Sequence, residues 1–149
     1  MDMLQAMNTG HDGSLSTGHG NSPADMIRRI ETMVLMGMTI NLEAVRGQIA
    51  GGLDIIIHLG RLRDGSRKVL EISEVSGMRD NEIVLNSLYE YEEETGEKTK
   101  QGNMTEQHLG KQQINKEEIK GGKIKGSLKS TGNKLQHTEK LMRAGIDIS

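Results

Sequence analysis

The sequence lacks several residue types on which small proteins rely for rigid structure. None of its 149 residues is Cys, Trp or Phe, two are Tyr and one is Pro. The absence of cysteine excludes a disulfide framework and agrees with a reducing compartment. Because aromatic residues are so few, the ten methionines supply much of the apolar volume, and they do so in a flexible form.

Long apolar runs are also missing. No stretch approaches the roughly 20 residues that a membrane-spanning helix needs. Met1 is followed by Asp2 and no basic segment, so we expect no secretory signal peptide. The formal net charge of −2 argues against a surface that coats nucleic acid.

A third absence concerns nucleotide chemistry. The pattern Gly-x-x-x-x-Gly-Lys-Ser/Thr does not occur, because Gly110-Lys111 and Gly122-Lys123 have neither the earlier glycine nor the following hydroxyl. That loop normally holds the β- and γ-phosphates and supplies a hydroxyl to Mg²⁺. Residues 69–74, which include Glu71 and Glu74, resemble a Walker B strand only faintly and fit a half-buried hairpin strand better.

The most unusual stretch that is present is residues 9–22. It contains two histidines, four glycines and five hydroxyl side chains in fourteen residues. Glycine allows close approach of the backbone to a ligand, and hydroxyl and imidazole groups can donate to an anion. A helix start follows, with Ser22 as N-cap, Pro23 at the first position and Asp25 as the acid of a capping box. A polar loop that leads into a helix N-terminus favours phosphate.

The rest of the pattern predicts two helices, an antiparallel meander and a short C-terminal helix. A short strand is expected at 14–18 before the first helix at 23–36. The second helix, 42–50, begins after Asn41 and ends at Gly51-Gly52. The apolar faces predicted for the two helices are Met26, Ile27, Ile30, Met33 and Val34 in the first and Leu42, Val45 and Ile49 in the second.

A β-branched run at 53–59 and the Asp64-Gly65 dipeptide predict a hairpin with a two-residue loop. The register that this loop implies pairs Leu59 with Leu70, Ile57 with Ile72, His58 with Glu71 and Ile56 with Ser73. A third strand is expected from Glu82 to about Leu88, after a turn at 79–81. Residues 92–134 are mostly polar and predict an exposed, partly disordered excursion. A helix at 138–144 is expected to end at Gly145, with Ile146 near Leu141.

The run 2–23 closely resembles the histidine-box region of the type II/type IV secretion ATPases, and the CpaF-type branch, which assembles Tad/Flp pili, is the best match. Further resemblance lies at 29–36, 48–50, 61–67, 137–141 and 144–146. It implies the fold class α/β, as the C-terminal portion of a RecA-like P-loop ATPase core. We divide the chain into 1–91 (ATPase part), 92–134 (excursion) and 135–149 (C-terminal helix and tail). Met1 is then expected to be an internal methionine of a longer reading frame.

The resemblance also implies a function. Full-length members hydrolyse ATP with Mg²⁺ as cytoplasmic homohexamers on an inner-membrane platform protein, peripheral to the membrane. This chain would be a fragment of such an ATPase, inactive alone and binding no cofactor tightly by itself. Its partners would be the missing N-terminal half or complete subunits. Leu4, Met7, Leu15 and the apolar helix faces would pack against that half. The alternative is a non-catalytic interaction module that docks onto a complete secretion ATPase.

Five residues are carried over to site roles by this resemblance. His11 and His19 would sense the γ-phosphate, while Thr17 and Asn21 would bond phosphate oxygens or an attacking water. Arg29 would either act near a nucleotide or form a salt bridge with Glu31 or a neighbouring carboxylate.

For the histidines the alternative is a solvated, glycine-rich surface turn. Many relatives carry bulkier residues where this chain has Gly18 and Gly20, and no metal site is expected from two histidines. A basic hairpin tip has two explanations, a contact with an acidic partner or a solvated sheet edge; it comprises Arg61, Arg63, Arg67 and Lys68.

Overall fold

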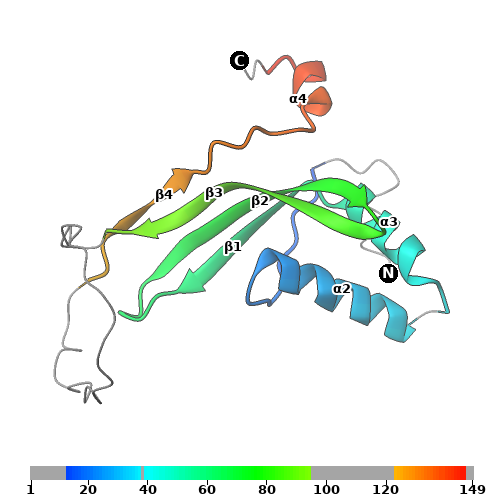
Figure 1. Ribbon diagram of the computed structural model, residues 1–149, viewed down its shortest axis with the longest axis horizontal. Coiled ribbons are helices and arrows are strands. Elements are labelled where there is room, and N and C mark those ends of the chain that lie inside the picture. The colour runs from blue at the N-terminus through cyan, green and yellow to red at the C-terminus, as the bar shows by residue number, and fades with distance from the viewer. Residues whose placement is uncertain (1–12, 38, 95–122, 147–149) are drawn as a thin grey trace, which may run out of the picture.

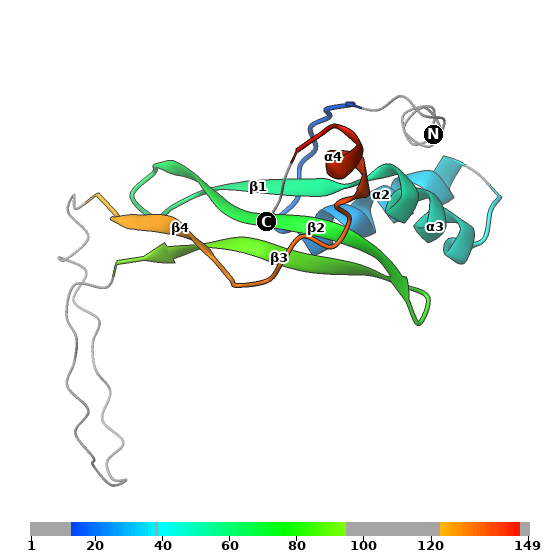
Figure 2. The ribbon, with the colours of Figure 1, turned by 90° about the horizontal axis from the view of Figure 1, so that it is seen from above.

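The computed structural model describes residues 13–37, 39–94 and 123–146. Two helices, α2 (Pro23–Gly37) and α3 (Leu42–Gly52), precede three long strands, β1 (Ile55–Arg61), β2 (Arg67–Arg79) and β3 (Glu82–Glu93). A short strand β4 (Gly126–Ser130) and a short helix α4 (Glu139–Arg143) follow. The helices lie on one face of the sheet, and the C-terminal segment that carries α4 crosses the opposite face (Figures 1 and 2). This is the α/β architecture predicted from the sequence.

The sheet has the order β1-β2-β3-β4, and every neighbouring pair is antiparallel. The strand β4, which pairs with β3 through Tyr91 and Leu128 among others, was not predicted. Its five residues include only one large apolar side chain, so the sequence carries little β pattern there. Pairing with β3 also extends that strand to Glu93, beyond the predicted end near Leu88.

The predicted hairpin register is confirmed for three of its four pairs. Ile56 faces Ser73, Ile57 faces Ile72, and His58 faces Glu71. The fourth is wrong, because a bulge after His58 places Leu59 opposite Val69. The cause of this shift in register is the length of the hairpin loop. Leu62 and Ser66 close it, Gly65 has φ +83°, and the Gly65 N–H donates to the Leu62 carbonyl over 2.9 Å. Such a three-residue loop with a left-handed glycine shifts the register by one.

The core lies between the two helices and the sheet. Its central cluster comprises Ile30, Val34, Val45 and Ile49, with Met26, Ile40, Leu53 and Ile83 packed around it. Val45 and Ile49 are both 0% exposed. The apolar helix faces are therefore buried within this chain, which corrects the expectation that they await a missing half. Leu42 and Met33 do not join them, being 40% and 59% exposed.

Both helix ends that the sequence specified most clearly are confirmed. The Asn41 side chain accepts a hydrogen bond from the Ala44 N–H over 2.7 Å at the start of α3. That helix continues through Gly51 and Gly52 instead of ending at them. At the end of α4, the N–H groups of Gly145 and Ile146 donate to the carbonyls of Met142 and Leu141, and Gly145 has φ +75°. This is the Schellman arrangement expected of a glycine there.

Removing one methyl group from the core should destabilise the chain measurably. Ile49→Val is expected to lower the free energy of unfolding by about 0.5–1.5 kcal/mol, because the vacated volume cannot refill completely. Ile57→Val removes the same group from a side chain that is 53% exposed, so its effect should be clearly smaller. Urea denaturation followed by circular dichroism compares the two. Equal losses would mean that the helix–sheet cluster is not the core.

Candidate functional site

The stretch that leads into α2 is an exposed arm, residues 13–22. It has no regular secondary structure before its last residues bend into the helix, so the strand expected at 14–18 is wrong. A strand needs a neighbour to pair with, and the described part of the chain pairs none with the arm. Figures 1 and 2 show the arm rising from the start of α2 past the edge strand β1. Leu15, its one large apolar residue, is 95% exposed.

The predicted ligand-binding side chains lie on this arm. Thr17, His19 and Asn21 are all exposed, and no hydrogen bond or ion pair joins these side chains to the rest of the described chain. His11 lies outside the described residues. The arm thus presents a hydroxyl, an imidazole and an amide to the surroundings within five residues. These groups can all donate hydrogen bonds to an anion, and nothing within residues 13–37, 39–94 and 123–146 competes for them.

The start of α2 uses its own acid as a cap. The Asp25 N–H donates to Ser22 Oγ over 3.1 Å, and Asp25 Oδ2 accepts from the Asn21 N–H over 2.9 Å. The acid therefore reaches one residue further back than in the usual capping box. Its negative charge already stabilises the helix N-terminus. The sequence suggested the N-terminus of α2 as a phosphate site, but Asp25 occupies it. An incoming phosphate would instead meet the donors of the arm.

Two glycines let the arm lie against the first turns of α2. A Cβ added to Gly18 would lie 2.4 Å from Met26 Cε, and one added to Gly20 would lie 3.2 Å from the Met26 Cα. Met26 itself packs against the core cluster. The Met26 side chain thus fills the space that a larger residue at position 18 would need. This methionine therefore packs beside the glycines on both sides of His19.

Arg29 does not form the salt bridge with Glu31 that the sequence left open. Glu31 is buried and accepts from Arg46 Nε over 2.7 Å, while Arg46 Nη1 donates to the Asn81 carbonyl over 2.5 Å. The hydrogen bond to Glu31 is the main reason that the pKa of Arg46 is raised. This network ties α2, α3 and the β2–β3 turn together. Arg29 stays exposed on α2, with no ionic partner seen in the described ranges.

Two arginines of the basic hairpin tip already have partners within the chain. Arg63 pairs with Glu93 over 2.6 Å, and Arg61 Nε donates to the Gly65 carbonyl over 3.2 Å. Asp64 accepts from the Ser66 hydroxyl and from the backbone N–H groups of Ser66 and Ile124, which lowers its pKa to about 2. These contacts fasten the tip to β3 and β4, so they favour the solvated sheet edge over a contact with an acidic partner.

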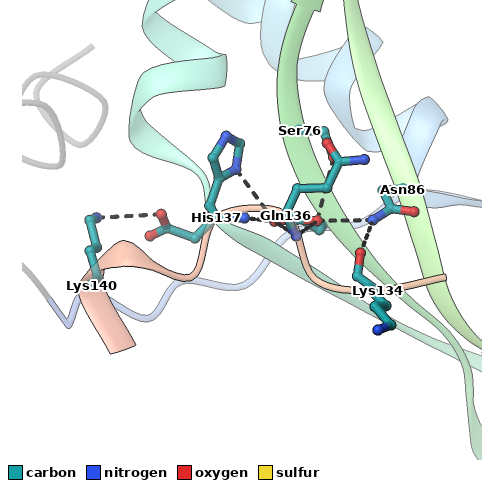
Figure 3. Close-up of polar contacts among 8 residues, drawn as sticks. Ser76, Asn86, Lys134, Gln136, His137 and Lys140 are labelled. Atoms are coloured by element: carbon teal, nitrogen blue, oxygen red, sulfur yellow. Dashed lines mark hydrogen bonds and ion pairs between the residues drawn. The ribbon is translucent and has the colours of Figure 1, made fainter. Parts of the chain in front are cut away.

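The other polar cluster centres on Glu74, which is 1% exposed (Figure 3). Its carboxylate accepts from the backbone N–H groups of Gln136 and His137 and from the Asn86 amide. Burial by itself would raise the pKa of Glu74. The donors from His137, Asn86 and Gln136 outweigh burial, so the pKa lies below its ordinary value. Sequence reasoning weighed this residue only as a Walker B candidate. Its backbone donors, Gln136 and His137, lie 62 and 63 residues further along the chain, so no local sequence pattern could indicate them.

Two features are absent from the described part of the chain. The residues that the structure describes contain no cluster of three His, Cys, Asp or Glu side chains that could hold a metal ion. No helix in the same ranges is long and apolar enough to cross a membrane.

The comparisons with known proteins identify a family. The family model described as "Type II/IV secretion system protein" matches residues 1–140. The chain belongs to this family. The prediction of the type II/IV secretion family is therefore confirmed, and the CpaF-type branch stays a prediction.

Two curated relatives show how much of the family's length is present. A Mycobacterium tuberculosis protein named as a candidate conjugal transfer protein, found in strains CDC 1551 and H37Rv, is 34% identical over 73 residues. That match covers 49% of this chain and 20% of the relative. The conjugal transfer protein TrbB of Rhizobium radiobacter is 28% identical over 95 residues, which are 64% of this chain and 28% of TrbB. The chain thus spans between a fifth and a third of these relatives.

The cap at Ser22 should stabilise the structure that carries the arm. Ser22→Ala is expected to lower the free energy of unfolding by about 1 kcal/mol, because the Asp25 N–H loses its acceptor. Ser16→Ala, on the exposed arm, should change it by less than about 0.5 kcal/mol. Thermal or urea denaturation provides the measurement. A loss at Ser16 as large as that at Ser22 would contradict the cap assignment.

Glu74 should make stability depend on pH in one direction. Its pKa is lowered in the folded chain, so its contribution is complete above the ordinary glutamate pKa and is lost as the pH falls through the folded value. Between about pH 7 and pH 3 the free energy of unfolding should therefore drop more for the wild type than for Glu74→Gln. Glu71→Gln, which changes the same group elsewhere on β2, should keep the wild-type slope. Parallel pH profiles for wild type and Glu74→Gln would refute this contribution.

Proposed function

We propose that this chain is the C-terminal part of an ATPase that powers type II/IV secretion, and that the arm contributes the side of the nucleotide site that faces the γ-phosphate. The observation that carries the proposal is the exposure of Thr17, His19 and Asn21 together on the arm, where their side chains form no hydrogen bond within the described residues. Polar side chains that bind nothing within their own chain are available to a ligand or to a neighbouring chain. Family membership makes a nucleoside triphosphate the ligand to test first.

The donor set suits a phosphate group. The imidazole of His19 donates to an anionic oxygen in its neutral tautomer or as imidazolium, and Thr17 and Asn21 add a hydroxyl and an amide. His11 joins this set by resemblance. Arg29, exposed on the following helix, would reach a phosphate at a subunit boundary. Mg²⁺ and the remaining phosphate contacts would come from a P-loop, and that motif is not in this sequence.

The oligomeric state and location of the protein are also part of the proposal. A homohexamer on an inner-membrane platform protein, peripheral to the cytoplasmic face, follows from the resemblance to CpaF-type ATPases of Tad/Flp pili. The relatives named for conjugal transfer make such transfer a second task to consider for the same class of motor. Both tasks use nucleotide turnover to move subunits, so they share one prediction for the arm.

A non-catalytic role is the second candidate. The missing P-loop motif and the exposed apolar residues of β1, Ile55, Ile57 and Leu59, favour a module that docks onto a complete ATPase. In that case the chain would bind a complete subunit and alter its turnover without contributing His19 to the chemistry.

The two candidates differ in the role of His19. We expect a protein that joins a P-loop-bearing N-terminal part from a member of the family to residues 1–149 to hydrolyse Mg–ATP. In that protein His19→Ala should lower kcat about 10²–10³-fold, because a donor to the developing charge is lost. Ser16→Ala, three residues away on the same arm, is the control and should retain full activity.

Steady-state phosphate release measures these rates. Equal kcat values for His19→Ala and Ser16→Ala would reject a catalytic arm. In a second experiment the unfused chain is added to complete TrbB. If the chain binds and changes ATP turnover, and His19→Ala does so equally, the result would favour the docking module.

A further inference from the structure

The C-terminal segment of residues 131–146 is called the strap here. Gln136 and His137, in its middle, are bound to the sheet through one buried carboxylate, that of Glu74 (Figure 3). The His137 N–H donates to Glu74 Oε1 over 2.7 Å, and the Gln136 N–H reaches both carboxylate oxygens, over 3.0 and 2.9 Å. His137 Nδ1 lies 3.4 Å from the same Oε1. Two consecutive backbone N–H groups aimed at one anion form a small nest, which binds negative charge.

The sheet side of this contact is equally specific. Asn86 Nδ2 donates to Glu74 Oε2 and to the Lys134 carbonyl, each over 2.9 Å, so one amide holds both the carboxylate and the strap. The Ser76 hydroxyl completes the set at 3.5 Å from Oε2. From the strap, the titratable side chain that faces Glu74 is His137. From the sheet, Asn86 and Ser76 face it, and both are neutral. The carboxylate is therefore the acceptor on which the junction depends.

The first residues of the strap, 131–133, still bond to the sheet. The Thr131 N–H donates to the Leu88 carbonyl over 3.0 Å, and the Asn133 amide donates to the Ser87 carbonyl over 2.8 Å. These bonds continue the β3–β4 pairing and do not involve Glu74. Residues 134–146 are the portion that depends on it.

After His137 the contacts with the rest of the described chain are exposed ones. Helix α4 has five residues, none of them buried, and the Thr138 side chain forms no capping bond. Lys140 lies 3.4 Å from Asp54, but both side chains are about two-thirds exposed, so solvent screens the pair. The central core cluster takes its residues from α2 and α3 and none from the strap. The helices and the long strands thus have a core that does not require residues 134–146.

We propose that Glu74 is a latch: neutralising its carboxylate frees residues 134–146 as one unit while the helices and β1–β3 stay folded. Without the charge, the nest of Gln136 and His137 loses its anion, and a buried acceptor that served four groups becomes a poor one. Residues 134–146 hold little buried apolar surface of their own, so local opening costs far less than global unfolding. The position of α4 over the sheet is then a two-state property of the fold, independent of any nucleotide.

Hydrogen exchange read by mass spectrometry on the full chain tests the latch. In Glu74→Gln one oxygen becomes an NH₂ group that cannot accept, so amides in 134–146 should exchange about tenfold faster or more than in wild type. Amides of α2, α3 and β1–β3 should keep their wild-type rates. Glu71→Gln makes the same change three residues away on β2, where the carboxylate contacts Ser73, and should leave 134–146 protected.

Two results would overturn the latch: unchanged exchange in 134–146 of Glu74→Gln, or faster exchange spread equally over the sheet. If Glu74→Gln yields no folded protein, a chain that ends at Asn133 decides. The latch predicts that this shorter chain keeps the wild-type protection of α2, α3 and β1–β3. Loss of that protection would show that residues 134–146 are an integral part of the core and would reject the proposal.

Discussion

The packing of α2 and α3 on the sheet is the constraint on which the rest of the structure depends. Val45 and Ile49 are fully buried there against Ile30 and Val34, and the Glu31–Arg46 pair bridges the two helices beside them. This contact fixes the direction of α2 and hence the place from which the arm departs. Any role of Thr17, His19 and Asn21 rests on it, because the arm has no regular structure of its own to position them.

The sequence predicted those features whose causes are local. Ser22-Pro23, Asn41 and Gly145 specify helix ends through their own side chains or backbone freedom, and all three are found where expected. What it missed depends on distant partners. The register slip at Leu59 follows from the three-residue loop, and β4 exists because β3 offers an edge to it. Glu74 illustrates the limit best, since its partners at 136 and 137 are invisible to any local pattern.

The site divides in the same way. The residue types of the arm predict phosphate-binding chemistry, which stays a prediction, and the structure leaves Thr17, His19 and Asn21 exposed. The helix N-terminus, which looked equally suited from the sequence, is occupied by Asp25. That Arg46, and not Arg29, is the partner of Glu31 could be found only from the three-dimensional packing of the helix pair. The arm, Arg29 and the apolar residues of β1 are therefore the surface through which this chain would complete a larger site.

The central claim is that the arm is one side of a nucleotide site whose phosphate cradle lies outside this sequence. Equilibrium titration of a fluorescent ATP analogue with Mg²⁺, against residues 1–149 alone and joined to a P-loop-bearing part, tests it most directly. The account predicts saturable binding to the joined protein, weakened by His19→Ala, and none to the chain alone over the same concentrations. Saturable Mg²⁺-dependent binding of equal affinity by the chain alone would contradict it.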